Sequence, residues 1–313
     1  KAFSLSRGEI LDLDVSDSKR SGVVTLIGKP NVGKSSLINC IMNQKVVIVS
    51  DKPQTTWHKI DCIYTQDNFQ IIFSDTPGVH KATNNINRYM LKAVTSALEG
   101  IDYILWILDG TKNITKAEDY IYEKISSQKS KVIPVINKID LIDTEKISQL
   151  ENDFIQKFGF ESVYKISALN GCGVDELLKF IKSNLPISPF LFDVDSLVNK
   201  PARFLISEII REKIFKFTFE EIPYSCGVFV ENIETDKNDK MLIRAEIYVE
   251  RKTQKGMLIG KDGSLINKIK SLSKKDIKYL FDSDCTLELY VRVKENWRQK
   301  DNIIFKDLYF DDL

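Results

Sequence analysis

Cysteine is scarce in this chain of 313 residues, and its five copies are scattered through the sequence. They stand at positions 40, 62, 172, 226 and 285, and no two of them form a C-x-x-C pair. An odd, scattered set of this kind excludes a disulfide framework and argues against a zinc site. We therefore expect ordinary buried or half-buried thiols and a reducing compartment, the cytoplasm.

Long hydrophobic runs and an excess of charge of one sign are also absent. No stretch of about 18 apolar residues occurs, so the sequence predicts no transmembrane helix, and no charged-then-apolar leader opens it. Lysine and arginine total 45 against 44 acidic residues, and a net charge of +1 does not by itself indicate a nucleic-acid-binding protein. With 43% hydrophobic residues the chain can build two cores, since single domains usually span about 100 to 200 residues.

A phosphate-binding pattern, G-x-x-x-x-G-K-[ST], is present at residues 28–35. An apolar β-branched strand precedes it at 23–27, and residues 36–42 follow with apolar side chains at helical spacing. At the start of such a helix the backbone N–H groups face an anion. There Lys34 would reach the β- and γ-phosphates, and the Ser35 hydroxyl would complete a Mg²⁺ shell. A glycine-bearing turn that matches by accident is the alternative, but it does not explain the motifs that follow.

The next motif suits the sensing of a γ-phosphate. A predicted strand at 69–74 ends at Asp75-Thr76-Pro77-Gly78. Asp75 can hold Mg²⁺, through a water molecule, and Gly78 can offer its N–H to the γ-phosphate. A nucleotide-dependent switch would be built here.

Two later segments select the base. In Asn137-Lys138-Ile139-Asp140 the carboxylate suits the N1–H and the exocyclic amino group that guanine has and adenine lacks. Asn137 would brace the loop, and the stem of Lys138 would cover the ring face. Ser167-Ala168-Leu169, after a predicted strand at 162–167, would give a backbone N–H to the base carbonyl. Polar pairs of this kind can discriminate by about 10⁴ or more, so the sequence predicts a guanine nucleotide, GTP or GDP.

A second unit follows a proline-bearing break. Pro186-Ile187-Ser188-Pro189 cannot continue a helix and begins a linker that reaches about Pro201. Beyond it the pattern predicts helices at 203–217 and 264–280 and strands at 224–234, 241–250 and 286–294. The segment 254–263 carries Gly260-Lys261-Asp262-Gly263, which fits the G-x-x-G loop of a KH module, a clamp for about four nucleotides of single-stranded RNA.

Basic residues gather around this loop. Between positions 251 and 278, nine Lys or Arg stand against two Asp. A solvated helix face is the alternative interpretation, and the adjacent G-x-x-G favours RNA. The predicted RNA contacts are Arg251, Lys255, Gly256, Gly260, Lys261, Gly263 and Lys268.

The order and spacing of these motifs resemble the Era-type GTPases of the TrmE–Era family over roughly residues 21–310. Gln54-Thr55-Thr56 is similar to that family's first switch, and the segment 75–80 to its second. The resemblance implies that Thr56, with Thr55 as the fallback, also holds Mg²⁺. Trp57 departs from the arginine usual in the family, and Asp262 departs from a frequent glycine in the KH loop.

Function is implied by the same resemblance: slow GTP hydrolysis, binding of small-subunit ribosomal RNA gated by the nucleotide state, a role in small-subunit assembly, and peripheral membrane association. In related GTPases the asparagine that matches Asn31 helps to hold K⁺ at the phosphates. Val79 stands where Ras-like enzymes have a water-orienting glutamine, which is why we expect slow turnover. A guanine-nucleotide-dependent RNA-binding scaffold with negligible hydrolysis is the rival. A GTPase that modifies tRNA is less favoured, because no segment is left for a modification domain.

Motifs and resemblance together define the candidate site. The catalytic candidates are Lys34, Thr56, Asp75 and Gly78, and the Mg²⁺ ligands are Ser35, Thr56 and Asp75. The predicted nucleotide contacts are Gly28, Lys29, Pro30, Asn31, Val32, Gly33, Lys34, Ser35, Asp75, Thr76, Pro77, Gly78, Val79, Asn137, Lys138, Ile139, Asp140, Ser167 and Ala168.

The predicted fold is α/β, a doubly wound P-loop GTPase sheet followed by a smaller α+β KH domain of type II. The strands at 60–65 and 69–74 are too close in sequence for a crossover, so we expect them to form an antiparallel hairpin at the sheet edge. The boundaries we expect are a tail at 1–20, the GTPase domain at 21–187, a linker at 188–200 and the KH domain at 201–313.

Overall fold

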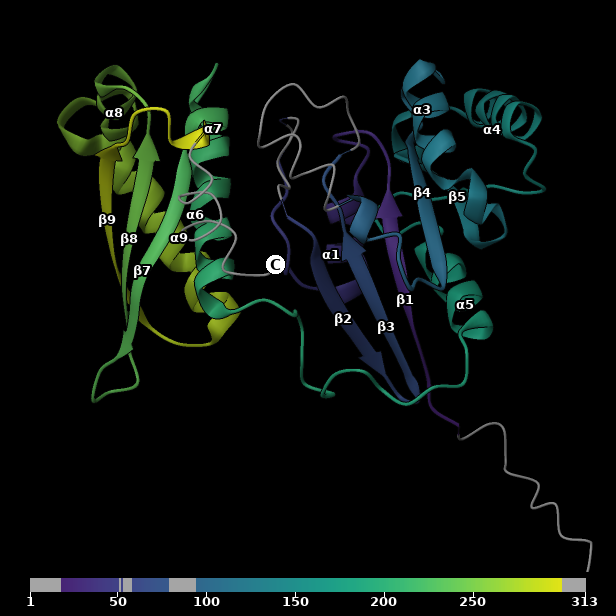
Figure 1. Ribbon diagram of the computed structural model, residues 1–313, viewed down its shortest axis with the longest axis horizontal. Coiled ribbons are helices and arrows are strands. Elements are labelled where there is room, and N and C mark those ends of the chain that lie inside the picture. Colours follow the sequence, from purple (N-terminus) through teal and green to yellow (C-terminus); the bar gives the residue numbers. More distant parts are fainter. Residues whose placement is uncertain (1–17, 51, 53–57, 79–93, 300–313) are drawn as a thin grey trace, which may run out of the picture.

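The first half of the chain is built on a six-stranded sheet (Figure 1). The structure is a computed structural model that describes residues 18–50, 52, 58–78 and 94–299. The strand order is β2-β3-β1-β4-β5-β6, and only β2 runs antiparallel to its neighbour. The strands are β1 (Arg20–Ile27), β2 (Ile60–Gln66), β3 (Phe69–Asp75), β4 (Tyr103–Asp109), β5 (Val132–Asn137) and β6 (Tyr164–Lys165). The doubly wound sheet and its edge hairpin β2–β3 are therefore confirmed.

Strand β6 is shorter than the segment predicted from the sequence, 162–167. Its last sheet bond runs from the Ile166 N–H to the Ile136 carbonyl, 2.8 Å. Ser167 then turns away, because its N–H donates to the Cys172 carbonyl at 2.9 Å. The loop that was predicted to approach the base thus begins where the strand ends.

Helices cover both faces of this sheet. Helices α1 (Lys34–Met42) and α5 (Val174–Asn184) pack into one hydrophobic cluster, and α3 (Lys116–Ile125) and α4 (Thr144–Phe158) pack into another. Trp106 of β4 is fully buried in the second cluster, with its ring centroid 4.7 Å from that of Phe154. Two short 3-10 helices, η2 (Ser126–Lys131) and η3 (Ile139–Leu141), flank β5. In sheets of this kind, ligands bind at the carboxyl ends of the parallel strands.

The second half has a three-stranded sheet with helices on one side (Figure 1). Strand β8 pairs antiparallel with β7 and parallel with β9. The elements are α6 (Ala202–Phe217), α7 (Ile222–Ser225), β7 (Gly227–Thr235), β8 (Met241–Val249), α8 (Lys252–Ile259), η4 (Lys261–Gly263), α9 (Ser264–Phe281), β9 (Cys285–Val293) and η5 (Trp297–Gln299). The order α6-β7-β8-α9-β9 is the KH arrangement that the sequence predicted, and helices α7 and α8 are additional to it.

Helix α8 was not predicted from the sequence, which assigned no element to residues 254–259. Gln254 is buried, and its side-chain oxygen accepts hydrogen bonds from the N–H groups of Glu250 and Arg251 at 2.9 and 3.0 Å. This cap satisfies backbone donors at the helix start, and Leu258 buries the other end in the core. Helix propensity did not predict this helix, because glycine, which stands at position 256, is unfavourable in a helix interior.

The linker is attached to the first sheet along much of its length. The Ile63 N–H donates to the Leu197 carbonyl at 2.9 Å, and the Asn199 N–H donates to the Asp61 carbonyl at 3.0 Å. Near the start of the linker, the Gln70 side chain accepts from the N–H of Leu191 at 2.8 Å. These bonds hold the segment against strands β2 and β3.

Helix α6 joins the two halves. Phe204 near its start belongs to the first core, and residues from Ile206 onward belong to the second. The sequence predicted an ordinary amphipathic helix, yet Glu212 on its polar side is only 5% exposed. Its carboxylate accepts from the Lys45 ammonium at 2.5 Å and from the Val49 N–H at 3.3 Å, both on the segment after α1. The polar side of α6 is therefore paired across the contact between the two halves.

Candidate guanine-nucleotide and RNA sites

Two glycines shape the phosphate loop between β1 and α1. A Cβ atom at position 28 would lie 2.4 Å from the Ile107 carbonyl oxygen. Gly33 has a φ of 98°, and a Cβ there would lie 2.2 Å from the Asn137 side-chain nitrogen. Because neither position has room for a side chain, the loop passes close to β4 and to the guanine motif at the same time. The glycines predicted from the pattern are thus required by the packing.

Lys34 is buried at the first turn of α1. Its ammonium donates to the carbonyls of Gly28 and Lys29 at 3.3 and 3.2 Å. Burial lowers the pKa of Lys34 to about 8, although the nearby Asp75 carboxylate opposes the shift. Among the described residues, the hydrogen-bond partners of this buried cation are backbone carbonyls, which it can exchange for an anionic phosphate.

This pKa predicts a pH-dependent affinity for nucleotide. Only the protonated ammonium attracts phosphate, so GTP affinity should fall as the pH rises through about 8. We expect about sevenfold weaker binding at about pH 8.8 than at about pH 7. Fluorescence titrations of the wild type and of Lys34→Ala over this range test the expectation. The variant should show a flat profile, and a flat profile in the wild type would contradict the role of Lys34.

Two side chains predicted to hold Mg²⁺ meet next to Lys34. The Ser35 hydroxyl donates to the Asp75 carboxylate at 2.6 Å, and Asp75 is fully buried at the end of β3. A hydroxyl and a carboxylate at one point form the hard-oxygen donor set that Mg²⁺ prefers. Thr56, the third predicted ligand, lies outside the described residues, as do Thr55, Trp57 and Val79.

The guanine motif is joined directly to the phosphate loop. The Asn137 amide donates to the Val32 carbonyl at 2.8 Å, and its oxygen accepts from the Ala168 N–H at 2.9 Å. Asn137 thus ties together the three loops that were predicted to hold the nucleotide. Asp140 is exposed, and its carboxylate is available to a base.

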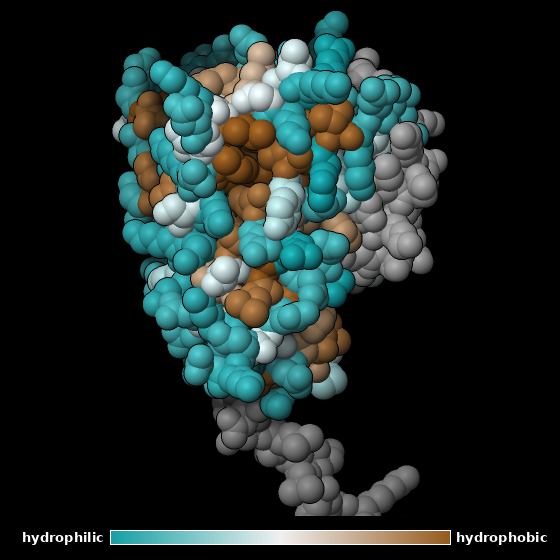
Figure 2. All heavy atoms as spheres, turned by 90° about the vertical axis from the view of Figure 1, so that its left-hand side faces the viewer, coloured by the Kyte–Doolittle hydropathy of each residue, from teal (hydrophilic) through white to brown (hydrophobic). Residues whose placement is uncertain are grey.

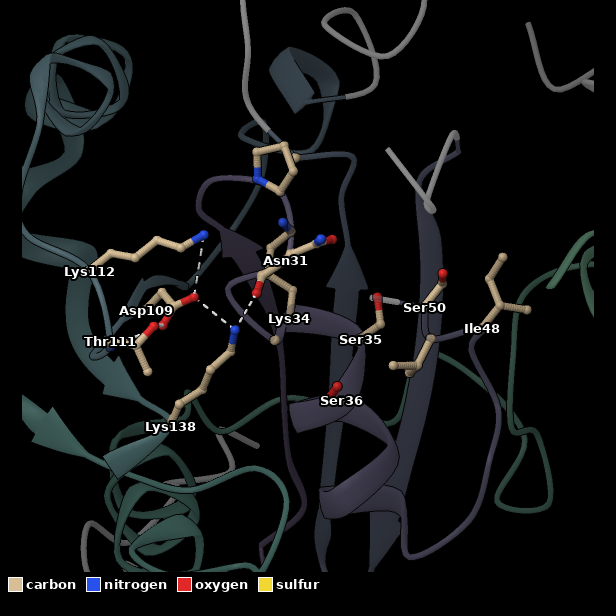
Figure 3. A pocket seen from close by; sticks show the side chains of 14 residues that line it. Asn31, Lys34, Ser35, Ser36, Ile48, Ser50, Asp109, Thr111, Lys112 and Lys138 are labelled. Atoms are coloured by element: carbon tan, nitrogen blue, oxygen red, sulfur yellow. Dashed lines mark hydrogen bonds and ion pairs between the residues drawn. The ribbon is translucent and has the colours of Figure 1, made fainter. Parts of the chain in front are cut away.

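Two adjoining cavities are lined by residues of the phosphate loop and the guanine motif. One of about 360 Å³ lies over the phosphate loop, and Figure 3 shows Asn31, Lys34 and Ser35 around it. The other, of about 760 Å³, lies over the guanine motif and includes Asp140 and Ala168. Both are lined by Gly33, Ser36, Val49 and Lys138. One continuous groove can therefore hold phosphates at one end and a base at the other.

Some predicted contacts lie behind the groove. Lys29 forms an ion pair with Glu118 at 2.5 Å, and the Thr76 hydroxyl donates to the Leu26 carbonyl at 2.6 Å. Gly78 lines the phosphate cavity against Pro30. The predicted residues that do not line either cavity are Gly28, Lys29, Val32, Asp75, Thr76, Pro77, Ile139 and Ser167.

Several lining residues escaped the sequence analysis. Asp109 ends β4, and Thr111 and Lys112 follow it. All three lie at the phosphate cavity, and residues 48–50 form its opposite wall (Figure 3). Asp109 could have been predicted as a site residue from its place at the end of a predicted parallel strand, because ligands of such sheets bind at the carboxyl ends of the parallel strands.

The G-x-x-G segment forms a tight turn at the start of α9. Gly260, Asp262 and Gly263 have φ values of 76°, 53° and 76°. A Cβ at position 260 would lie 2.8 Å from that of Leu265, whereas one at position 256 would meet nothing within 4 Å. Gly260 is thus required by the backbone, and Gly256 is not required by packing.

The side chains around this turn are mixed. Lys261 and Arg251 are exposed, whereas the Lys268 ammonium lies 4.2 Å from the centroid of the Phe217 ring on α6. Figure 2 shows the side of the molecule where α8 and β9 lie, with a band of hydrophobic side chains between hydrophilic borders. Ile259 and Leu289 are among the partly exposed apolar residues of these elements. An exposed apolar band next to a cationic turn offers contacts for bases and for phosphates.

Fold and site together define a P-loop GTPase that carries a KH domain. Models of two protein families match the chain: one described as "50S ribosome-binding GTPase" covers residues 23–138, and one described as "KH domain" covers 221–298.

Relatives give the family. GTPase Era of Thermotoga petrophila is 47% identical over 298 residues, with 94% of this chain and 99% of that protein covered. GTPase Era of Thermosipho melanesiensis is 46% identical over 294 residues, with 94% and 98% covered. The chain belongs to the Era family of GTPases, which confirms the resemblance found in its motifs.

Solved structures agree. A crystal structure of Era in complex with MgGDPNP and nucleotides 1506–1542 of 16S ribosomal RNA matches with a TM-score of 0.89, 33% identity and coverage of 93% of this chain and 99% of that one. An Aquifex aeolicus Era variant bound to GDP and AlF4⁻ matches with a TM-score of 0.88 and 32% identity over the same shares. Within the described ranges, no helix combines the length and apolarity needed to cross a membrane.

Proposed function

We propose that this GTPase binds small-subunit ribosomal RNA through its KH domain and assists assembly of the small ribosomal subunit. The observation that carries the proposal is the cationic G-x-x-G turn at the start of α9, in the same chain as a guanine-nucleotide groove. The related structure that holds both MgGDPNP and a segment of 16S ribosomal RNA supports it. In this proposal the nucleotide state gates RNA engagement.

At the nucleotide site, each group takes one role in this proposal. Lys34 binds the β- and γ-phosphates, the Gly78 N–H binds the γ-phosphate, and Asp140 reads guanine. Ser35 and Asp75, whose oxygens lie 2.6 Å apart, hold Mg²⁺ together with Thr56. When bound, the ion neutralises charge on the phosphates. Residues 21–187 form the GTPase domain in this proposal, and residues 188–200 form the linker.

At the RNA site, residues 201–313 form the KH domain. Gly260 and Gly263 let the RNA backbone approach the N-terminus of α9, and Lys261 contacts a phosphate. Arg251, Lys255 and Lys268 add positive charge along the path. The Asp262 carboxylate has to face away from the RNA, because a carboxylate beside a phosphate lowers affinity.

The same proposal sets the location. We place the protein in the cytoplasm, where its RNA partner is assembled. Peripheral association with the membrane stays a prediction of the family resemblance, and none of the contacts described here supports it.

A GTPase assay tests the enzymatic part of the proposal. Multiple turnover of GTP should be slow. The rate should be higher in K⁺ than in Na⁺, because Asn31, which lines the phosphate cavity, would hold K⁺ there. Asn31→Ala should lose the difference between the two ions. Equal wild-type rates in K⁺ and Na⁺ would rule out the K⁺ site, and no turnover in either ion would restore the scaffold alternative.

A further inference from the structure

Asp109 is a buried carboxylate that no motif explains. It is the last residue of β4, and 4% of it is exposed. One of its oxygens accepts from the N–H and the hydroxyl of Thr111 at 3.0 and 2.6 Å. The other accepts from the Lys138 ammonium at 2.7 Å.

Lys138 carries this contact to the phosphate loop. Its ammonium also donates to the Asn31 carbonyl at 2.7 Å, as Figure 3 shows. The preceding residue, Asn137, donates to the next carbonyl of the same loop, that of Val32. Two consecutive side chains of the guanine motif therefore hold two consecutive carbonyls of the phosphate loop.

We propose that Asp109 is a positioning residue for nucleotide binding, which holds Lys138 across the groove and keeps the guanine loop and the phosphate loop in one arrangement. The inference rests on the proposed guanine-nucleotide site. Lys138 shares the phosphate cavity with two other cations, Lys34 and Lys112. Like charges repel, so a carboxylate is needed to keep this ammonium inside the groove.

The environment of Asp109 fits that task. Burial alone would raise the pKa of its carboxyl, but the hydrogen bonds from Lys138 and Thr111 prevail and lower it. The carboxylate is consequently charged at neutral pH. Lys112 contributes less, because its ammonium is 3.9 Å away and its side chain is 60% exposed.

This role differs from base recognition in a measurable way. Asp140 meets the edge of the base, so its loss should change which base is preferred. Asp109 acts through Lys138 on the whole groove, so its loss should weaken every purine nucleotide alike. Slow chemistry makes KM close to the dissociation constant, so KM should rise while kcat stays the same.

The test compares Asp109→Asn, Lys138→Met and the double variant in the full chain. We expect Asp109→Asn to weaken binding of GTP, inosine triphosphate and xanthosine triphosphate by about tenfold each, with kcat within about twofold of the wild type. The double variant should bind like Lys138→Met alone, because Asp109 acts through that lysine. Asp119→Asn, which removes an exposed ion pair with Lys157 elsewhere in the domain, is the matched control.

Three results would overturn the inference: wild-type affinity in Asp109→Asn, a loss confined to guanine, or a double variant weaker than Lys138→Met. If Asp109→Asn does not fold, the double variant decides, since it leaves no unpaired buried charge. A wild type that fails to bind GTP would instead contradict the proposed function.

Discussion

Replacing Asp140 with asparagine should turn the protein from GTP toward xanthosine triphosphate. In the proposed site the carboxylate accepts from the N1–H and the amino group of guanine, whereas an asparagine amide would donate to the 2-oxo group of xanthine. Asp140 lines the larger of the two cavities. GTP binding should fall by about 100-fold or more, and xanthosine triphosphate binding should rise. Competition titration with a fluorescent nucleotide measures both.

A control on the same domain separates base recognition from a general charge effect. Asp153 is exposed on α4, and Asp153→Asn removes the same charge away from the groove. It should leave both affinities unchanged. If Asp140→Asn keeps the wild-type preference for GTP, the assignment of Asp140 fails.

The second large effect concerns RNA. Lys261→Asp would place two adjacent carboxylates, with Asp262, where phosphates should lie. Binding of single-stranded RNA should fall by about tenfold to a hundredfold, and affinity for GTP should hold. Because phosphate contacts release counterions, the salt dependence of the variant should also be shallower. Electrophoretic mobility shifts at several salt concentrations provide the measurement.

Lys179→Asp is the matched control, since Lys179 is exposed on α5 in the GTPase half. Its RNA affinity should change little. Equal losses in the two variants would mean that overall charge, and not the G-x-x-G turn, determines RNA binding.

The candidate site could be predicted from the sequence where its chemistry constrains a short, contiguous segment. The phosphate loop and the guanine motif can each be recognised from its own short sequence. A backbone cradle for phosphate and a carboxylate that recognises a base both need particular residues at fixed spacing. The edge hairpin followed from a connection too short for a crossover. The residues that connect these segments in space could not be predicted from the sequence. Asp109 and Lys138 are 29 positions apart, and only the parallel pairing of β4 with β5 brings them together.

Burial between the two halves was also invisible in the sequence. Glu212 looks like a solvated helix residue, and only the packing of α6 against the segment after α1 gives it Lys45 as a partner. Helix α8 escaped for a local reason, since its cap comes from Gln254 reaching back to two backbone donors. The pattern of polar and apolar residues in a helix indicates which of its faces packs on its own domain. It does not indicate which polar residues a second domain buries.

Crosslinking the protein to RNA in cells and sequencing the bound RNA tests the central claim most directly. The account predicts that the reads concentrate on small-subunit ribosomal RNA and that Lys261→Asp removes this enrichment while GTP binding persists. Reads spread evenly over cellular RNA, concentrated on tRNA, or unchanged in Lys261→Asp would contradict it.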